Sequence, residues 1–210
     1  MIKPELLAPA GDLSTLKVAI QAGADAVYIG GKSFGARYFA TNFSNEELEE
    51  AVCYAHKRNK KVYVTVNTII FQDEINELKE YIDYLYNINV DAIIVQDLAV
   101  ISIVREKYPD FEIHASTQMN IFDINGIEKL KKLGVKRVVL ARETSIDDIK
   151  KLSNEGLEIE VFVHGALCFS CSGNCLMSYS IGQRSGNRGK CAQPCRKTYS
   201  LYENNKLVVN

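Results

Sequence analysis

The cysteines of this chain are concentrated in one short stretch whose chemistry suits metal binding. Five of the six lie between positions 168 and 195, directly after the apolar run Ile159–Val163. No Asp or Glu occurs from Val161 to Tyr202, but that stretch contains five basic residues, Arg184, Arg188, Lys190, Arg196 and Lys197. Positive surroundings favour the thiolate, which is the form of cysteine that binds metals. We therefore predict a metal or iron–sulfur centre with the ligands Cys168, Cys175, Cys191 and Cys195.

The spacing of these four cysteines leaves the identity of the centre open. Four thiolates suit zinc, but the pattern Cys-x6-Cys followed by Cys-x3-Cys lacks the Cys-x2-Cys knuckle that is common in structural zinc sites. Irregular loops readily hold iron–sulfur clusters. The residues alone therefore allow three alternatives: an iron–sulfur cluster, a zinc site, or reduced cysteines that bind no metal and pack near the barrel mouth. Cys171 lies inside the first loop and is a spare or substitute ligand.

The composition indicates a single globular domain. The 210 residues are 47% hydrophobic and 24% charged, with a formal net charge of −1, and no apolar segment has the length of a signal peptide or a membrane helix. A secreted, disulfide-stapled domain would spread its cysteines over the fold. We therefore expect a cytoplasmic protein without membrane contact. The net charge of the chain is close to neutral, so two roles remain open for the five basic residues: contact with RNA phosphates, or a place in a solvated loop.

The elements that would position the cysteines follow one repeated pattern, a helix ending on Gly or Asn, a short turn and a β-branched run. It occurs at 22–30, 88–96 and 133–141. Gly and Asn tolerate the left-handed conformation that ends a helix, and continuous apolar runs indicate strands buried on both faces of a parallel sheet. The pattern predicts seven strands separated by helices: Glu5–Ala8, Ala26–Gly30, Val62–Asn67, Ala92–Gln96, Glu112–Ala115, Arg137–Ala141 and Glu158–Val163.

Strict alternation of strands and helices allows a doubly wound open sheet or a (β/α) TIM-type barrel. We favour the barrel because polar residues follow many of the strands, whereas an open sheet would gather them at one switch point. The barrel is expected to be incomplete, with seven parallel strands, then a cysteine-rich loop and a hairpin. The expected organisation is βα units over 1–164, a cysteine-rich metal or cluster loop at the barrel mouth over 165–197, and a hairpin over 198–210.

The polar residues at the strand ends are candidates for a catalytic site. Two histidines, His114 and His164, and the carboxylate Glu160 are the candidates for catalysis. Arg142 carries the planar fork that binds carboxylates. The candidates for substrate binding are Arg142, Glu143, Asn67, Gln96 and Gln118. A structural role for each histidine, and a fixed pairing of Glu143 with Arg142, are the alternatives.

A longer series of motifs resembles a known family. The segment Glu160-Val-Phe-Val-His-Gly-Ala-Leu-Cys168 continues to Gly173-Asn-Cys175-Leu-Met-Ser178, and Asn187-Arg-Gly-Lys-Cys191-Ala-Gln-Pro-Cys195 follows. With Glu5–Gly11, Gly23–Tyr28 and His114–Gln118, this series is similar throughout to the collagenase-like peptidase family, the unassigned-mechanism peptidase family thirty-two. The resemblance implies a barrel fold and, through the family label, proteolysis. No His-Glu-x-x-His or Gly-x-Ser-x-Gly motif supports proteolysis independently.

The better understood members of that family imply a different activity. They are oxygen-independent RNA and quinone hydroxylation proteins, several with a 4Fe–4S cluster and with prephenate as the oxygen source. The segments Asn67–Phe71, Val95–Asp97 and His114–Met119 are most similar to the branch that hydroxylates a cytidine of 23S rRNA, with the tRNA uridine branch as the alternative. The resemblance therefore implies an RNA partner, either rRNA or tRNA, a cluster and prephenate as co-substrate. A peptidase is the second possibility, and a non-catalytic subunit of a hydroxylase complex is the third.

The chain departs from the family pattern in two places. Cys171 stands where the family usually has an aromatic residue. A further family cysteine lies beyond the Cys191–Cys195 pair, past the last residue of this sequence. We therefore expect a complementary subunit or a missing C-terminal part, and either Cys195 or Cys171 would complete a cluster built from this chain alone.

Overall fold

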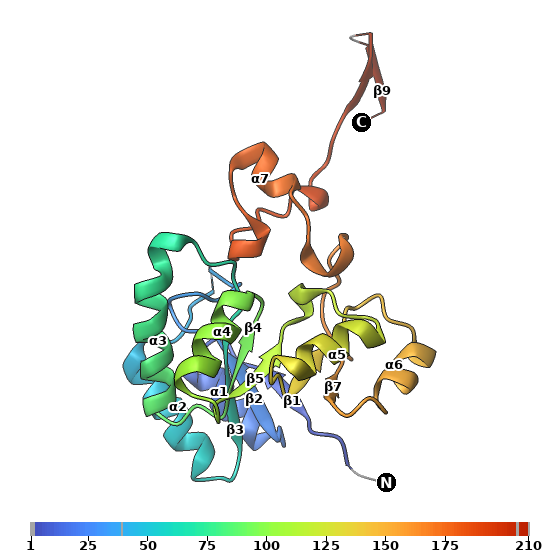
Figure 1. Ribbon diagram of the computed structural model, residues 1–210. Helices are drawn as coiled ribbons and strands as arrows, with labels where there is room; N and C mark the ends of the chain where they lie inside the picture. Colours follow the sequence, from blue (N-terminus) through green and yellow to red (C-terminus); the bar gives the residue numbers. More distant parts are fainter. Residues whose placement is uncertain (1–2, 39, 205, 210) are drawn as a thin grey trace.

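The computed structural model describes residues 3–38, 40–204 and 206–209. Its centre is a parallel sheet of seven strands in the order of the sequence, which curls into a half-barrel (Figure 1). The strands are β1 (Leu7–Pro9), β2 (Ala26–Ile29), β3 (Lys61–Val66), β4 (Ala92–Val95), β5 (Glu112–Ala115), β6 (Arg137–Val139) and β7 (Glu158–Glu160). The predicted incomplete barrel is therefore confirmed.

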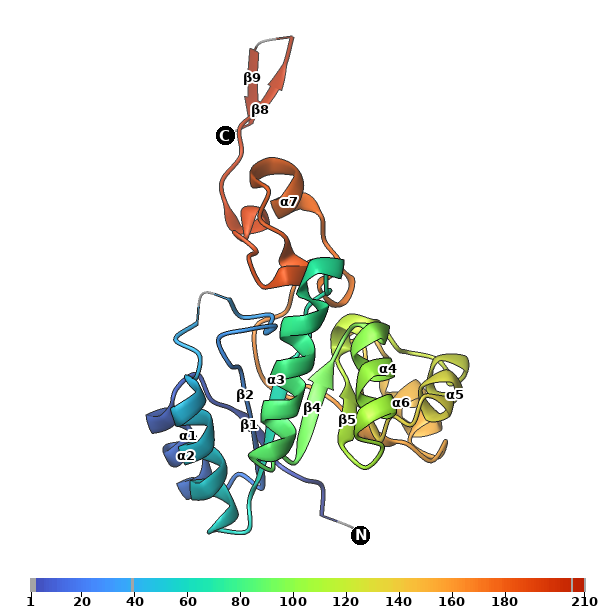
Figure 2. The same cartoon turned by 60° about the vertical axis from the view of Figure 1, so that its left-hand side comes forward.

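Helices separate consecutive strands and cover the outside of the sheet (Figures 1 and 2). They are α1 (Leu13–Gln21), α2 (Asn45–His56), α3 (Ile75–Asn87), α4 (Leu98–Lys107), α5 (Ile124–Lys132) and α6 (Ile146–Leu152). Local sequence fixes their ends. Ser44 and Glu47 form the capping box that begins α2, and Gly23, Asn89 and Gly134 have positive φ just after α1, α3 and α5. These are positions where Gly and Asn are tolerated best.

Alternation of side chains divides the core into two parts. The main apolar cluster lies between the sheet and the helices and includes Val27, Val64, Ile93, Ile113 and Val138. The barrel interior holds a much smaller apolar cluster of Ala26, Tyr63, Ala92 and Ile94. Successive strand residues point to opposite faces, so the interior positions of β5, β6 and β7 carry the charged and polar residues of those strands.

Charged residues inside the barrel connect the two open edges of the sheet. Arg137 on β6 donates to Glu158 Oε2 on β7 at 2.7 Å and to Glu5 Oε1, just before β1, also at 2.7 Å. The Tyr63 hydroxyl donates to the same Glu5 carboxylate. Among the described residues, β1 pairs only with β2 and β7 only with β6. Side chains inside the barrel therefore link the two open edges of the sheet. In a closed barrel, a further strand would lie between these edges.

The last strand of the sheet is shorter than expected. The sequence predicts a strand over Glu158–Val163, but the ladder with β6 ends at the pair Val139 and Glu160. Residues 161–169 are exposed, because β6 stops there and offers no further partner. The chain then rises above the barrel and ends in an antiparallel hairpin of β8 (Leu201–Glu203) and β9 (Lys206–Val209). The hairpin extends away from the barrel (Figure 2).

Across the described ranges, no helix is both long enough and apolar enough to span a lipid bilayer.

Candidate functional site at the barrel mouth

The segment 165–197, which we call the cysteine segment, lies over the carboxyl ends of the strands (Figures 1 and 2). It contains four short helices, η3 (Cys171–Gly173), α7 (Met177–Gly182), η4 (Gly186–Arg188) and η5 (Pro194–Arg196). Between them the backbone is irregular, and most of its side chains are exposed. Such a segment has little apolar core of its own. Its position therefore depends on specific contacts with the loops of the barrel.

The first contact joins Ser172 to the loop after β6. The Ser172 amide donates to Glu143 Oε1 at 2.8 Å, and the Ser172 hydroxyl donates to Glu143 Oε2 at 2.7 Å. The Arg142 amide in turn donates to the Ser172 hydroxyl. Ser172 is fully buried and has a φ of +38°, an uncommon conformation for a residue other than glycine. Hydrogen bonding by Ser172 lowers the pKa of the Glu143 carboxyl, so this carboxylate is an anchor for the cysteine segment.

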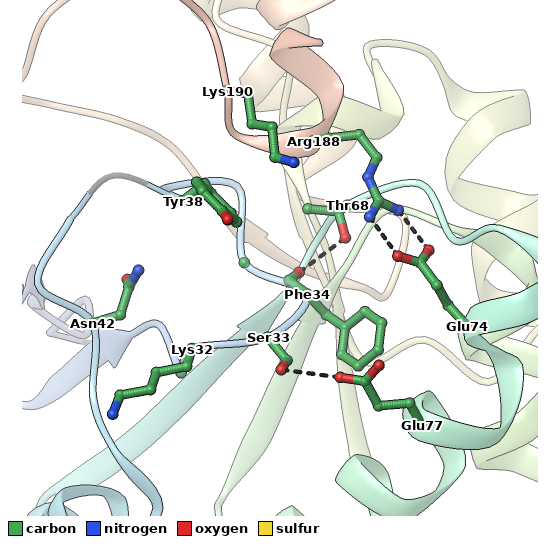
Figure 3. A pocket seen from close by; sticks show the side chains of 12 residues that line it. Lys32, Ser33, Phe34, Tyr38, Asn42, Thr68, Glu74, Glu77, Arg188 and Lys190 are labelled. Carbon is green, nitrogen blue, oxygen red and sulfur yellow. Dashed lines mark hydrogen bonds and ion pairs between the residues drawn. The ribbon is translucent and has the colours of Figure 1, made fainter. Parts of the chain in front are cut away.

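The second contact joins Arg188 to the loop after β3. The Arg188 guanidinium binds both carboxylate oxygens of Glu74, one of them at 2.6 Å, and also donates to the Ile69 carbonyl at 2.6 Å (Figure 3). Two-pronged binding of this kind fixes orientation as well as distance. The Arg188 hydrogen bonds lower the pKa of Glu74. The cysteine segment is thus held at two different strand ends.

Gly189 brings the cysteine segment against the loop between β2 and α2. A side-chain carbon on Gly189 would lie 2.6 Å from the carbonyl carbon of Ala36 and 2.9 Å from the Tyr38 nitrogen. These atoms belong to the backbone and have little freedom to move away. The φ of Gly189 is +70°, which also favours glycine. Only glycine therefore allows this close approach.

A cavity of about 160 Å³ lies beside this contact (Figure 3). Its wall comes from the loop after β2, the beginning of α3 and η4. The lining combines Lys32 and Lys190 with the paired Arg188 and Glu74. The cysteine segment therefore contributes Arg188 and Lys190 to a cavity that is lined mainly by loops of the barrel.

Three of the predicted substrate-binding residues follow adjacent strands, as expected. Asn67, after β3, accepts a hydrogen bond from the Ala36 amide at 2.9 Å and so positions the loop after β2. Gln96 follows β4, and Gln118 lies in the short helix η2 (Thr117–Met119) after β5. The side-chain oxygens of Gln96 and Gln118 are buried and have no hydrogen-bond partner within the described ranges. Asn67 is thus engaged, whereas the two glutamines offer free polar groups.

Two predicted catalytic residues lie away from the mouth, which corrects the sequence-based placement. His114 is 0% exposed, and its Nε2 lies 2.8 Å from Glu112 Oε1 at the start of the same strand. Its ring packs edge-on against Tyr63, and burial lowers its pKa. Glu160 is also directed inward, 3.5 Å from Arg137, and burial raises its pKa. Side-chain alternation sends both residues into the barrel interior, because His114 precedes the end of β5 and Glu160 belongs to the ladder of β7.

The remaining strand-end candidates differ in how they are engaged. Arg142 is partly exposed after β6, and its guanidinium lies 5.8 Å from the centre of the Phe162 ring. Glu143 does not serve as a fixed partner for Arg142, since both of its oxygens bind Ser172. His164 is exposed in the irregular segment after β7. Arg142 is therefore the candidate whose charged group remains available at the mouth.

The predicted metal ligands do not gather in the structure. All five cysteines of the segment are free thiols, and no group of three or more His, Cys, Asp or Glu side chains among the described residues is placed to hold a metal. The predicted convergence of Cys168, Cys175, Cys191 and Cys195 is therefore not seen. The contacts of Ser172, Arg188 and Gly189 with the barrel loops hold the segment in place, and they do not bring the four sulfurs together.

Two of the cysteines nevertheless have surroundings that suit a thiolate ligand. Cys175 Sγ accepts the Met177 amide and Cys191 Sγ accepts the Gln193 amide, each at 3.3 Å. Hydrogen bonds from amides to sulfur tune metal-bound thiolates. A side-chain carbon on Gly186 would lie within 4 Å of both Cys175 and Cys191, so the two residues flank the same glycine. The donor chemistry thus fits a metal centre, although the full ligand set is not assembled.

Sequence reasoning missed the residues that hold the cysteine segment. Glu74 and Ser172 were not singled out, and Arg188 was noted as a basic residue near the thiols and within the family motif, without a partner assigned to it. The interior pair of Glu5 and Arg137 was also missed. A signal for the interior pair was present, because Glu158-Ile-Glu160 alternates charged and apolar residues, which indicates one polar face on a strand.

Comparison with known proteins identifies the family. The model of peptidase family U32 matches residues 11–208. Over 202 residues the chain is 44% identical to the tRNA hydroxylation protein P1 of Bacillus subtilis, covering 96% of this chain and 48% of that protein. Over 207 residues it is 42% identical to the 23S rRNA 5-hydroxycytidine synthase of Escherichia coli, covering 98% of this chain and 31% of that protein. The chain thus spans half or less of the length of these relatives.

The fold agrees with a solved structure of the same family. The U32 peptidase Mk0906 superposes with a TM-score of 0.70 at 15% identity, covering 99% of this chain and 86% of that chain. At such identity the likeness concerns the fold alone. From the match of the family model over nearly the whole sequence and from the two relatives, we conclude that this chain belongs to peptidase family U32.

Proposed function

We propose that this chain is the barrel part of an enzyme that hydroxylates a pyrimidine of 23S rRNA or tRNA without molecular oxygen. The names of the two relatives described above both refer to RNA hydroxylation. Because the chain covers half or less of those proteins, the whole activity is proposed for a longer protein or for a complex with a complementary subunit. An enzyme acting on rRNA or tRNA also suits a cytoplasmic location.

One observation at the site supports a pyrimidine as the substrate. The side-chain oxygens of Gln96, Gln118 and Asn120 are buried at the ends of β4 and β5, without hydrogen-bond partners among the described residues. A buried acceptor left without a partner costs about 1–3 kcal/mol, so a ligand that supplies N–H donors is favoured. The edge of cytosine offers an amino group and that of uracil an imino group. A base reaches such a position only when it is unpaired or flipped.

Arg142 is the residue that we assign to the oxygen-supplying co-substrate. Prephenate carries carboxylates, and the guanidinium fork binds a carboxylate through two parallel hydrogen bonds. Within the described ranges, Arg142 makes no ion pair with a protein carboxylate, since Glu143 is engaged by Ser172. The amide groups would hold the base while Arg142 holds the carboxylate, and both lie at the same end of the barrel.

The cysteine segment is the part that would hold a 4Fe–4S cluster, with zinc as the alternative. Cys175 and Cys191 already accept amide hydrogen bonds, and Cys168 and Cys195 would complete four ligands. A bound cluster would supply electron transfer. The task of the protein is then to keep this segment over the mouth, which the Glu143 and Glu74 contacts do.

Proteolysis is less well supported by the contacts of the candidate groups. His114 is buried and hydrogen-bonded to Glu112, and the hydroxyl of Ser116 accepts a hydrogen bond from the Gln118 amide. A serine mechanism needs a nucleophile within hydrogen-bond reach of a base, and neither residue is engaged in that way.

The test is nucleoside mass spectrometry of 23S rRNA and tRNA from a strain lacking the gene. We expect one hydroxylated pyrimidine to disappear and to return when the wild-type gene is supplied. A gene carrying Gln118→Ala should restore little of it, and Lys150→Gln, on the outer helix α6, should restore it fully. Persistence of every hydroxylated pyrimidine in the deletion strain, together with cysteine- or metal-dependent cleavage of gelatin by the purified protein, would establish a peptidase instead.

A further inference from the structure

Two aromatic rings beside the cavity each carry a cation. Lys190 Nζ lies 4.5 Å from the centre of the Tyr38 ring, and Arg188 Cζ lies 4.4 Å from that of Phe71. Figure 3 shows Lys190 and Arg188 descending from the cysteine segment toward the loops of the barrel. Tyr38 is 54% exposed and Phe71 is 56% exposed. Both rings therefore face solvent next to positive charge at the mouth.

Two further pairs of this kind continue around the mouth. Arg196 Cζ lies 5.8 Å from the Phe169 ring, and Arg142 Cζ lies 5.8 Å from the Phe162 ring. Phe169 is 82% exposed, which is unusual for a large apolar side chain. Exposed apolar groups that cluster on a surface commonly mark an interaction site. All four rings belong to the cysteine segment or to loops at the carboxyl ends of strands.

The cysteine segment carries positive charge without acidic residues of its own. The stretch from Val161 to Tyr202 has no acidic residue. Arg188 is neutralised by Glu74, but Lys190 and Arg196 make no ion pair with a carboxylate in the part of the chain that the structure describes. Lys190 and Arg196 thus keep positive charge that a polyanion could meet.

We infer that the four rings, together with Lys190 and Arg196, form a binding surface for single-stranded RNA around the barrel mouth. Proteins that bind single strands combine aromatic rings, on which bases stack, with cations that follow the phosphates. This surface has both, and the cavity between Tyr38 and Arg188 offers room beside the path of the strand. The inference rests on the proposed function and specifies the form of RNA that is bound and the residues that bind it.

The inference is tested by the affinity of the purified chain for a fluorescent single-stranded RNA over a series of salt concentrations. Phe169→Leu and Phe71→Leu remove a ring but keep an apolar side chain. Each should weaken binding roughly 5- to 150-fold, the range for one stacked base, and leave the salt dependence unchanged. Phe169→Tyr should bind the RNA as tightly as the wild type, because tyrosine keeps an aromatic ring at this position.

The cation variants should give a different signature. Lys190→Gln and Arg196→Gln should each reduce the slope of log K against log salt by about 0.7, the value for one phosphate contact on a single strand. Tyr54→Leu and Lys107→Gln, on the outer helices α2 and α4, are the matched controls and should change neither affinity nor slope. Thermal melts of all variants verify that they fold.

Several results would overturn the inference. They are equal affinity for a duplex of the same sequence, no binding of RNA by the wild-type chain, or wild-type behaviour of both the ring and the cation variants. If Phe169→Leu instead converts a dimer into a monomer in light scattering, the rings are covered by a second copy of the chain, and the inference is wrong. The proposed hydroxylation is tested separately by the nucleoside measurement, so the failure of one is distinguishable from the failure of the other.

Discussion

Arg137 and Glu5 are 132 positions apart in the sequence, yet the Arg137 guanidinium donates to Glu5 Oε1 at 2.7 Å inside the barrel. Glu5 precedes the first strand and Arg137 begins the sixth, and Glu158 on the seventh strand accepts from the same guanidinium. The open edges of the sheet are therefore joined by one nearly buried cation. This pairing raises the pKa of Arg137, so the guanidinium is charged at every accessible pH.

Removal of that cation should destabilise the barrel. Arg137→Met keeps an apolar stem but leaves Glu5, Glu158 and Glu160 without their shared partner. Truncation of one member of a buried ion pair is costly, and with partial exposure of the carboxylates we expect a loss of about 3 kcal/mol in the free energy of unfolding. Urea denaturation measures it. Lys150→Met on the surface is the control, and an equal effect of both substitutions would contradict the role of Arg137.

Gly189 should be irreplaceable in docking the cysteine segment. Gly189→Ala places a carbon 2.6 Å from the Ala36 backbone and should cost about 1–3 kcal/mol of local stability, seen as faster amide exchange in 184–197. Gly182→Ala is the matched control, since nothing lies within 4 Å of its added carbon and alanine favours helix. Unchanged exchange in Gly189→Ala would show that the close approach is not required.

Docking of the cysteine segment should depend on acid pH. Hydrogen bonds from Ser172 lower the pKa of Glu143 below the ordinary 4.5, and those from Arg188 do the same for Glu74. A carboxyl with a lowered pKa stabilises the docked state above its ordinary pKa, and this stabilisation is lost as the pH falls through the lowered value. We therefore expect the protection of backbone amides in 184–197 from hydrogen exchange to fall as the pH drops below about 4.5.

Substitution of the two carboxylates separates this effect from general acid unfolding. Glu143→Gln keeps an oxygen that accepts the Ser172 amide but cannot titrate, so the remaining acid response should come from Glu74. In the double variant with Glu74→Gln, the protection of these amides should be the same across this pH range. An unaltered acid midpoint in the double variant would contradict the assignment.

Arg142→Lys should weaken the binding of a small dicarboxylate such as prephenate. Lysine keeps the charge but loses the two-pronged geometry, and we expect roughly a tenfold loss of affinity by isothermal titration. Lys129→Arg, in the last turn of α5, is a control for surface charge. Equal binding by wild type and Arg142→Lys would remove Arg142 from the site.

The metal content of the cysteine variants should identify the ligands. In protein purified without oxygen, Cys175→Ser should abolish bound iron and any brown colour. Cys53→Ser, on the outer helix α2, should leave the iron content unchanged, and Cys171→Ser should do so if Cys195 is the fourth ligand. Zinc in place of iron, or full iron content in Cys175→Ser, would contradict the predicted cluster.

The strands were predictable because their signal is local. Runs such as Ala26–Ile29 and Ala92–Val95 are β-branched or apolar segments bounded by turn residues, and the structure places strands there with a shift of no more than two residues at most ends. The capping box of Ser44 and Glu47 likewise involves residues only three positions apart. Such patterns depend only on residues that are close together in the chain, so they can be recognised from the sequence alone.

The direction of side chains at the strand ends was harder to predict. His114 was expected at the mouth, but it lies inside the barrel, because a difference of one residue along a strand decides which face of the sheet a side chain occupies. Glu160 lies in β7, within the predicted strand Glu158–Val163, and is likewise directed inward. Glu143 was taken as a substrate ligand, and only the folded chain shows that its oxygens are engaged by Ser172.

By itself, the sequence determined the alternation of strands and helices, the basic cysteine-rich segment and the family. Only the tertiary structure decided how that segment is held and which polar groups remain free. The contacts of Glu74 with Arg188 and of Glu5 with Arg137 join residues more than a hundred positions apart. Their pairing depends on how the curled sheet brings strand ends together in space, and periodicity along the chain carries no information on such distances.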